Sequence, residues 1–449
     1  MEEASTGVQR AEDYPRASQG WFAVGVLSAL YACSFIDRQI IALMVVPIQR
    51  DLALSDTQMS LLLGPAFAIF FALMGLPMGA LVDRVSRKGV IATGVAAWSL
   101  FTAGCGLSSS YAQLFLMRMG VGVGEATLGP GAYSMITDYF RASHLSRAMS
   151  VFGLGVVFGS GLASIIGGYV IEASMSVGEV AVPLLGVLRP WQVVFIGVGL
   201  PGLLLAALMM AVREPPRRAA VAAIEAGGLW RQLSRRRHAY LALMGGFGLF
   251  SLFGYGAGAW LPTYLMRSHG FPVHQVGLLI GLGTIILGAS GTLFWGAFND
   301  RLVSKGRRDA PFVLGPIIGL GLGVAGVTMG LATSHALVIA GVLLFALFGA
   351  VWSGITAASL QLMTPGRLRG RVSAVYLIVN NAVGLGVGPL LIALTTDRLF
   401  GDPLAVGKSI ALVGGVVLTI AILLLMSGRK AYLAALDEEA GVAVAAIRA

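Results

Sequence analysis

The chain has 449 residues, of which 57% are hydrophobic and only 12% are charged. A soluble protein of this length needs many more charged side chains on its surface, and a mean hydropathy of +0.83 is typical of a chain surrounded mostly by lipid. The 62 glycines show no Gly-X-Y period, so a collagen-like chain is excluded, and close packing of membrane helices explains them better.

The first apolar run begins at Trp21 and continues to about Pro47, which is too long for the core of a signal peptide. We therefore expect a retained spanning helix. A helix needs about 20 apolar residues to cross a bilayer, and twelve such runs follow one another along the chain. The predicted spans are Trp21–Pro47, Met59–Val82, Gly89–Ser108, Ala112–Thr137, Ala148–Ile171, Trp191–Val212, Tyr240–Met266, Val276–Phe298, Pro311–Ala332, Ala336–Met363, Val372–Thr395 and Gly407–Ser427.

Most lysines and arginines of the tails and loops fall on one side of these spans, and the other side carries few. The positive-inside rule then predicts that both termini are cytoplasmic. The same asymmetry explains the net charge of +10, so nucleic-acid binding is not needed to account for it. We expect a monomer in a cell membrane, the bacterial inner membrane in particular.

The spans divide into two sets of six. The predicted organisation is an N-tail over residues 1–20, a six-helix bundle over 21–212, a basic cytoplasmic linker over 213–238, a second bundle over 239–428 and a cytoplasmic C-tail over 429–449. The linker contains Arg235-Arg236-Arg237. It is expected to obey the positive-inside rule, and a contact with anionic lipid headgroups is the alternative.

A repeat relates the two sets. The loop after the second span reads Gly79-x-x-x-Asp83-Arg84, and the loop after the eighth reads Gly296-x-x-x-Asp300-Arg301, each followed by basic residues. A second echo, Arg147 against Arg371, has nearly the same offset. Duplicated six-helix halves around a central site suit alternating access, so we expect a secondary transporter.

These motifs resemble a known family. Asp83-Arg84-Val-Ser86-Arg87-Lys88 is similar to the signature between spans two and three of the major facilitator superfamily, with Ser86 where the family pattern has Gly. The resemblance covers essentially the whole chain. It implies an all-α integral membrane protein with twelve transmembrane helices in two six-helix bundles.

A second stretch narrows the resemblance. Arg118-Met-Gly-Val-Gly-Val-Gly-Glu125 in span four and Asp37-Arg38 in span one resemble the spinster-like subfamily, although facilitators for sugar acids and organic anions carry similar motifs. The resemblance implies an amphipathic lipid cargo, such as a lysophospholipid or a sphingosine-1-phosphate-like molecule. A small organic anion, sugar acid or drug is the alternative. A membrane-embedded enzyme or a channel is disfavoured, because no second catalytic signature and no filter element is visible.

Charged residues within the spans mark the expected site. A charge at mid-membrane costs at least ~2.5–3.5 kcal/mol, so it normally faces a cavity or a partner. Asp37 and Arg38 lie about two-thirds along span one, while Arg118 and Glu125 are two turns apart on one face of span four. We expect Asp37 and Glu125 to exchange protons with Arg118 as the switching partner. Arg38 or Arg118 could instead bind an anionic headgroup, and a permanent ion-pair network between the two spans is the structural alternative.

The second half lacks matching buried charges and offers an aromatic, weakly polar wall. The candidate substrate contacts there are Tyr255, Trp260, Trp352 and Asn380. Trp260 could equally be an interfacial aromatic and Asn380 a helix-packing residue.

A third group of charges lies at the predicted cytoplasmic ends of the spans and, by the family resemblance, closes the inner side. Its members are Asp83, Arg84, Arg87, Asp138, Arg147, Asp300 and Arg301. The positive-inside rule alone does not explain the repeated aspartate. The two cysteines and five scattered histidines have no metal-ligand spacing, so neither a metal nor a cofactor is expected; the driving force would be a proton gradient.

Overall fold

The computed structural model describes residues 14–183, 186–217, 227–349, 351–365 and 368–448. The first half of the chain forms helices and one β-hairpin, β1–β2, in which Val180 pairs with Leu188 in antiparallel register. Its elements are α1 (Ala17–Leu43), α2 (Val45–Leu52), α3 (Asp56–Leu63), α4 (Pro65–Arg84), α5 (Arg87–Cys105), α6 (Tyr111–Glu125), α7 (Leu128–Tyr139), α8 (Ala142–Val177), β1 (Val180–Val182), β2 (Gly186–Leu188) and α9 (Pro190–Ala211).

The second half is helical throughout its described parts and includes π-helical turns. Its elements are α10 (Gly227–Arg235), α11 (Arg237–His269), α12 (Val273–Leu282), η2 (Gly283–Gly288), α13 (Ala289–Ser304), α14 (Ala310–Leu331), α15 (His335–Phe348), α16 (Trp352–Leu362), α17 (Arg369–Asn380), η4 (Asn381–Val387), α18 (Gly388–Leu394), η5 (Thr395–Phe400), η6 (Pro403–Ala405) and α19 (Val406–Arg448).

Within the described residues, 10 helical stretches are long and apolar enough to cross a bilayer. The two remaining predicted spans are Gly89–Ser108, which forms α5, and Ala112–Thr137, which forms α6 and α7. The second of these is interrupted after Glu125 because Pro130 has no N–H to continue the hydrogen-bond ladder of the helix. Both helices pack inside the first bundle, so the twelve-helix arrangement of an all-α membrane protein is retained.

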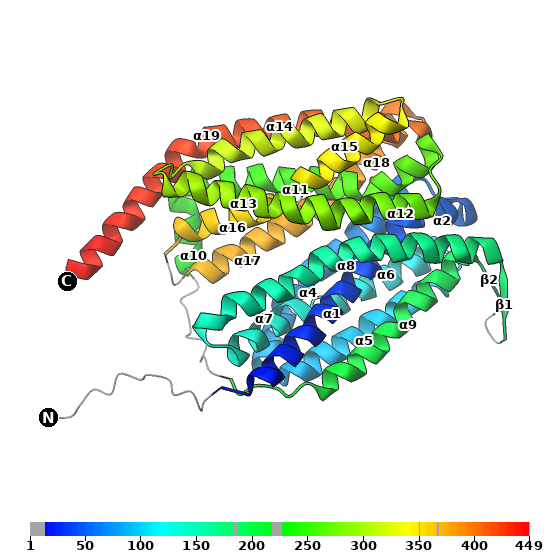
Figure 1. Cartoon of the computed structure of the whole chain (residues 1–449), viewed down its shortest axis with the longest axis horizontal. Helices are drawn as coiled ribbons and strands as arrows, with labels where there is room; N and C mark the ends of the chain where they lie inside the picture. The colour runs from blue at the N-terminus through cyan, green and yellow to red at the C-terminus, as the bar shows by residue number, and fades with distance from the viewer. Residues whose placement is uncertain (1–13, 184–185, 218–226, 350, 366–367, 449) are drawn as a thin grey trace.

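The halves form two bundles that lie side by side (Figure 1). α1 and α4–α9 make one bundle, and α11–α19 make the other. The start of α1, the last turns of α19 and the short helix α10 lie at one end, which we call the basic end because it carries Arg84, Lys88 and Arg301. The opposite end carries β1–β2 and α2, and we call it the hairpin end.

The two bundles share a core at the hairpin end. Ile40, Ile48 and Met59 of the first half belong to the same buried apolar cluster as the core of the second half. Near the basic end, Trp98 and Ile136 belong to a separate cluster built almost wholly from the first half. Burial of apolar surface is the main stabilising term in such contacts, so the halves are joined more firmly at the hairpin end.

One glycine illustrates how closely the halves meet. Gly64 lies between α3 and α4, and a Cβ at this position would be 2.3 Å from the carbonyl oxygen of Leu385 in η4. No side chain fits into that space, so glycine is required for this approach.

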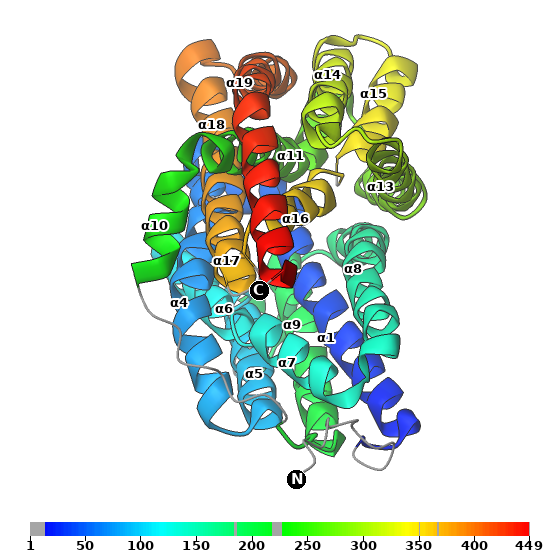
Figure 2. The same cartoon turned by 90° about the vertical axis from the view of Figure 1, so that its left-hand side faces the viewer.

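The predicted linker and C-tail are partly helical. Residues 218–226 of the linker lie outside the described part, but its last third forms α10, which shows as a short helix beside α17 in Figure 2. α19 continues beyond the predicted span end at Ser427. It meets the linker through Arg236, which is buried and bonds to Glu438 (Nη2–Oε2, 2.7 Å) and Glu439 (Nη1–Oε1, 2.8 Å).

Candidate functional site

The charged residues predicted from spans one and four lie close together, where α1 and α6 meet. Asp37, Arg118 and Glu125 are each about 2% exposed or less. The α1 helix supplies Asp37 and Arg38, while α6 supplies Arg118 near its middle and Glu125 at its last residue. Such residues are tolerated in a membrane helix when they face a partner or a cavity, and both situations occur here.

Glu125 is compensated by Arg38. The Arg38 Nε donates to Glu125 Oε2 at 2.7 Å, and Nη2 forms an ion pair with the same oxygen. The Ser34 hydroxyl, one turn earlier on α1, also donates to Oε2 at 2.6 Å. The second oxygen, Oε1, is buried and has no hydrogen-bond partner among the described residues.

Arg118 does not take the predicted role of ion-pair partner in this conformation. Its guanidinium donates to the main-chain oxygens of Asp37 and Leu62, each at 3.4 Å, and it forms no ion pair within the described residues. The reason is distance along the helix: seven residues correspond to about 10 Å of rise, so Arg118 and Glu125 share a face without touching. Arg38 crosses from α1 and reaches Glu125 instead.

The carboxyl group of Asp37 is the least compensated group of the cluster. Its Oδ1 is buried and lacks a hydrogen-bond partner among the described residues. An ionised carboxylate in that position would be costly, because burial without a partner removes its hydration and returns little. The cluster therefore contains one carboxylate with an ion-pair partner, Glu125, and one, Asp37, that forms no ion pair within the described ranges.

Aromatic rings hold the Arg38 guanidinium from the other side. Its central carbon lies 4.6 Å from the ring centre of Phe67, 5.0 Å from that of Phe71 and 5.1 Å from that of Phe35. The guanidinium of Arg118 lies 5.6 Å from the Phe67 ring. Cation–π attraction at these distances positions both arginines around Phe67 without using up all their hydrogen-bond donors.

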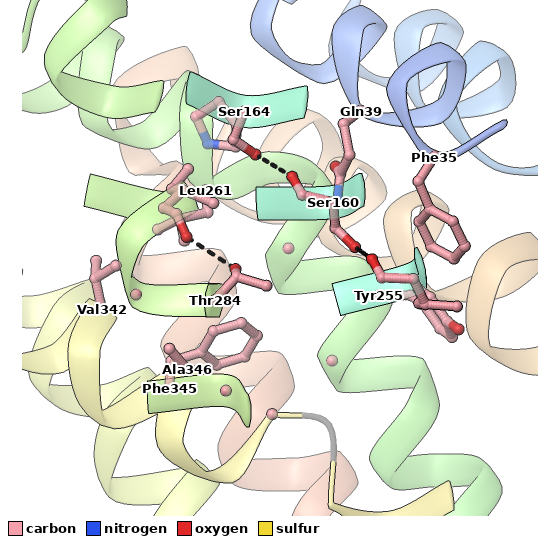
Figure 3. A pocket seen from close by; sticks show the side chains of 18 of the residues that line it. Phe35, Gln39, Ser160, Ser164, Tyr255, Leu261, Thr284, Val342, Phe345 and Ala346 are labelled. Carbon is pink, nitrogen blue, oxygen red and sulfur yellow. Dashed lines mark hydrogen bonds between the residues drawn. The ribbon is translucent and has the colours of Figure 1, made fainter. Parts of the chain in front are cut away.

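Two cavities that share lining residues lie beside this cluster. The smaller has a volume of about 170 Å³ and is lined by Arg38, Arg118 and Phe67 from the first half, facing Tyr255 and Pro389. The larger, about 330 Å³, is mostly apolar. Figure 3 shows Gln39 of α1, Ser160 of α8 and Phe345 of α15 around it. Phe35, Gln39, Gly254, Tyr255 and Gly258 line both cavities, and neither Asp37 nor Glu125 lines either one.

The predicted contacts in the second half divide into two groups. Tyr255, Trp352 and Asn380 line the larger cavity, and Asn380 Oδ1 has no partner among the described residues. Trp260 does not line either cavity. It is fully buried, and its indole N–H donates to the Pro389 carbonyl at 3.0 Å, which fastens α11 to α18. Its place on α11, inside the bundle, makes it a packing residue.

Several cavity residues were not predicted. Phe35, Gln39, Ser160, Ser164, Thr284 and Phe345 line the larger cavity. Gln39 is the only one of these with a visible signal, since it is an amide within a predicted span. Phe35 and Phe345 are indistinguishable in sequence from lipid-facing residues. The Ser164 hydroxyl donates to the Ser160 carbonyl at 3.0 Å, as serines in membrane helices commonly do.

The charges predicted to close the inner side lie at the basic end, and part of the group is assembled there. Arg87 is buried and forms ion pairs with Asp138 and with Glu214, the latter at 3.2 Å between Nε and Oε1. Glu214, which was not predicted, also accepts the Arg87 backbone N–H at 2.9 Å. Burial raises the pKa of Glu214, but the hydrogen bonds from Ser86 and Arg87 and the Arg87 charge outweigh it, and the net pKa is lowered.

The remaining members of this group are exposed. Asp83 and Arg84 at the end of α4, and Asp300 and Arg301 at the end of α13, face the surface. Arg147 is exposed as well, with its guanidinium 5.5 Å from the Trp21 ring centre. The ion pairs of Arg87 therefore connect segments of the first half to one another. The repeated Asp-Arg motifs of the two halves are exposed and are not buried against one another in this conformation.

Two helical bundles of membrane-spanning length, with cavities lined by residues of both halves, are the architecture of a multi-pass membrane transporter. The sequence model of the family named Major Facilitator Superfamily matches residues 27–389 of the chain. The chain therefore belongs to this superfamily. It is accordingly a transporter rather than an enzyme.

The similar proteins include transporters of several kinds. The chain is 29% identical over 390 residues to an MFS-type efflux pump of Mycolicibacterium smegmatis, covering 86% of each protein. It is 28% identical over 406 residues to the human protein spinster homolog 1, covering 84% of this chain and 73% of that protein. A bacterial homolog of the human lysosomal transporter Spinster, solved in an inward-facing and unoccupied conformation, superimposes with a TM-score of 0.76 at 24% identity, covering 94% of this chain and 98% of that one. This last likeness concerns the fold.

Proposed function

We propose that the protein moves an amphipathic lipid with an anionic head, such as a lysophospholipid or a sphingosine-1-phosphate-like molecule, by proton-coupled alternating access. The observation that carries the proposal is the pair of cavities: a small one lined by Arg38 and Arg118 shares lining residues with a larger, mostly apolar one. A guanidinium fork suits a phosphate or carboxylate head, and the apolar cavity suits a single alkyl tail. The motif resemblance to the spinster-like subfamily implies the same class of cargo, and the chain is similar in sequence to protein spinster homolog 1.

Proton coupling is proposed for the carboxylates behind the smaller cavity. Asp37 carries a buried oxygen with no hydrogen-bond partner among the residues that the structure describes, and Glu125 is paired with Arg38, which itself lines the cavity. An anionic head that draws Arg38 away would leave Glu125 uncompensated, and burial would then favour its protonated form. Substrate binding and proton uptake would thus be linked through a single guanidinium.

The proposed orientation puts the basic end in the cytoplasm and the hairpin end outside. It rests on the distribution of lysine and arginine, with both termini on the cytoplasmic side of a bacterial inner membrane. In that orientation the shared core at the hairpin end corresponds to an inward-facing conformation. The proposed working unit is a monomer with no partner other than its cargo, protons and the bilayer.

The second candidate is the transport of a small organic anion, sugar acid or drug. A specific observation supports it: the smaller cavity has a volume of about 170 Å³ and is lined by both Arg38 and Arg118, which suits a compact anion without a tail. The similarity to an efflux pump also favours a drug-like cargo.

The test uses purified protein in liposomes with an imposed pH gradient. Flux of a labelled lysophospholipid and of sphingosine-1-phosphate is compared between wild type, Asp37→Asn and Glu125→Gln. Asp51→Asn is the matched control, because Asp51 pairs with Arg189 near the hairpin end, away from the cavities. We expect gradient-dependent flux in wild type and the control, and its loss in the two variants.

The outcomes separate the parts of the proposal. Lipid flux that ignores the pH gradient would retain the cargo and reject the coupling. Absence of lipid flux, with gradient-dependent flux of a sugar acid or a drug, would reject the lipid in favour of the second candidate.

A further inference from the structure

A polar network joins the two halves at the hairpin end, where the sequence had indicated no functional group. It involves Gln49 of α2, Asp56 and Thr57 at the start of α3, Arg267 in the last turn of α11, and Asp397 of η5. The first three belong to the first half of the chain and the last two to the second. The bonds of Arg267 to Asp56 and Gln49, and of Asp397 to Thr57, therefore cross the interface that alternating access must open.

Arg267 is the centre of this network. Its guanidinium meets the Asp56 carboxylate in the two-pronged geometry that arginine favours, with Nη1–Oδ2 at 2.9 Å and Nη2–Oδ1 at 3.0 Å. Nη2 also donates to Gln49 Oε1 at 2.6 Å, and the Gln49 amide donates to Asp56 Oδ1 at 2.7 Å. The side chains are largely removed from water, at 16% exposure for Arg267 and 4% for Asp56. Burial makes the pair less sensitive to screening than a surface ion pair.

Asp397 makes the second connection, directly to the backbone of the opposite half. Its Oδ2 accepts both the Thr57 backbone N–H at 2.7 Å and the Thr57 hydroxyl at 2.6 Å. Thr57 is the second residue of α3, so this N–H is one of those that have no partner within the helix. The carboxylate of Asp397, from the second half, thus caps the N-terminus of α3 in the first half.

The apolar contacts at the same end cannot by themselves select one arrangement of the two halves. Ile40, Met59 and the rest of the shared cluster favour any arrangement that excludes water. The forked pair and the cap require particular atoms to meet, and they are lost when the halves separate. Asp56 lies in the first turn of α3, Asp397 accepts a hydrogen bond from the N-terminus of the same helix, and Arg267 lies in the last turn of α11, so each charge faces a favourable helix end.

We propose that Asp56–Arg267–Gln49 and Thr57–Asp397 form a releasable lock that holds the hairpin end closed, and that the transport cycle breaks both connections to open this end. The lock acts independently of which molecule is carried and of whether protons drive it.

The test measures the separation of the two halves directly. Spin labels are attached to Ser176→Cys and Thr333→Cys, two exposed positions on either half at the hairpin end. The native Cys33 and Cys105 are both buried, so they do not compete for the label. Distance distributions are recorded in detergent for the labelled wild type and for variants Arg267→Ala, Arg267→Lys and Asp397→Asn. We expect Arg267→Ala and Asp397→Asn to raise the long-distance population about fivefold or more, and Arg267→Lys to fall in between because it keeps the charge and loses the fork.

Arg189→Ala is the matched control. Arg189 also pairs with an aspartate near this end, Asp51, but both belong to the first half, so its removal should leave the distances unchanged. If Arg267→Ala fails to fold, Asp397→Asn decides the question. Unchanged distances in the folded lock variants, or equal opening in Arg189→Ala, would overturn the lock. The distance measurement uses no cargo and no pH gradient. A negative result for lipid transport would therefore leave the proposed lock unaffected.

Discussion

Arg38 is paired with Glu125, whereas its neighbour in sequence, Asp37, accepts from Arg118 through its main-chain oxygen and keeps a carboxyl oxygen with no hydrogen-bond partner in the described part of the chain. Two arginines and two carboxylates are thus present without forming two pairs. The asymmetry assigns different chemistry to the carboxylates: Glu125 is fixed by a cation that lines the cavity, and Asp37 lies behind it. The following predictions begin with this pair.

Arg38→Ala should destabilise the protein, because it leaves Glu125 buried beside no cation. Removal of one partner of a buried pair typically costs about 3–5 kcal/mol, and the residual exposure of Arg38 places the effect near the lower figure. Thermal unfolding in detergent measures it. The double variant Arg38→Ala, Glu125→Gln should recover a large part of the loss, and an additive double variant would contradict the pairing.

Arg118→Gln should weaken transport of a cargo with an anionic head while sparing a neutral amphiphile of the same chain length. A hydrogen bond to a charged group contributes about 1.5–3 kcal/mol, so we expect the KM for the anionic cargo to rise about tenfold to a hundredfold. Flux measured as a function of cargo concentration gives the KM. An equal rise for both cargoes would place Arg118 in a structural role.

Trp260→Phe should lower stability by about 1 kcal/mol, the usual contribution of one hydrogen bond, because the bond to the Pro389 carbonyl is lost. Transport should be otherwise unchanged, since the side chain lies outside both cavities. Thermal unfolding and flux are measured on the same preparation. A selective change in KM without a loss of stability would restore Trp260 as a substrate contact.

Gly64→Ala should impair closure of the hairpin end, because its methyl group would lie 2.3 Å from the Leu385 carbonyl oxygen. Overpacking of this kind typically costs about 1–3 kcal/mol. Gly75→Ala on α4 is the matched control, since a Cβ there meets nothing within 4 Å. The spin-label distances across the hairpin end should lengthen in the first variant and stay constant in the second.

Glu214 gives a pH dependence of stability on the acid side. Its pKa is lowered below the ordinary 4.5, so the folded protein binds fewer protons than the unfolded chain around that pH. The stabilisation is fully present above the unfolded pKa and is lost as the pH falls through the folded pKa. The melting temperatures of wild type and Glu214→Gln should therefore differ at pH 7 and converge below about pH 4. A constant difference across this range would contradict the prediction.

The sequence was most informative where a residue conflicted with its surroundings. Asp37, Arg118 and Glu125 stand out because charges are rare in apolar spans, and the helical period places Arg118 and Glu125 on one face. Which arginine reaches Glu125 depends on how α1 and α6 are rotated against each other. That rotation is set by packing across the bundle and leaves no trace in the spacing of either helix.

The hairpin-end residues show the opposite case. Asp56, Arg267 and Asp397 lie at the ends of spans, where charged residues are ordinary, so nothing in the sequence marks them. Glu214 was missed for the same reason, being one acid in a basic linker. Trp260 was assigned to the substrate because an aromatic residue in a span can face lipid, cavity or neighbouring helix, and only the fold distinguishes these.

The core shared by the two halves at the hairpin end also has a thermal consequence. Opening that end exposes apolar residues such as Ile48 and Met59, so the step between conformations carries a positive heat-capacity change. Hydrophobic attraction weakens on cooling, and the closed arrangement loses part of its advantage in the cold. The resting balance of conformations is therefore a property of temperature as well as of sequence, and the rate at which this protein turns over should follow a curved rather than a straight Arrhenius plot.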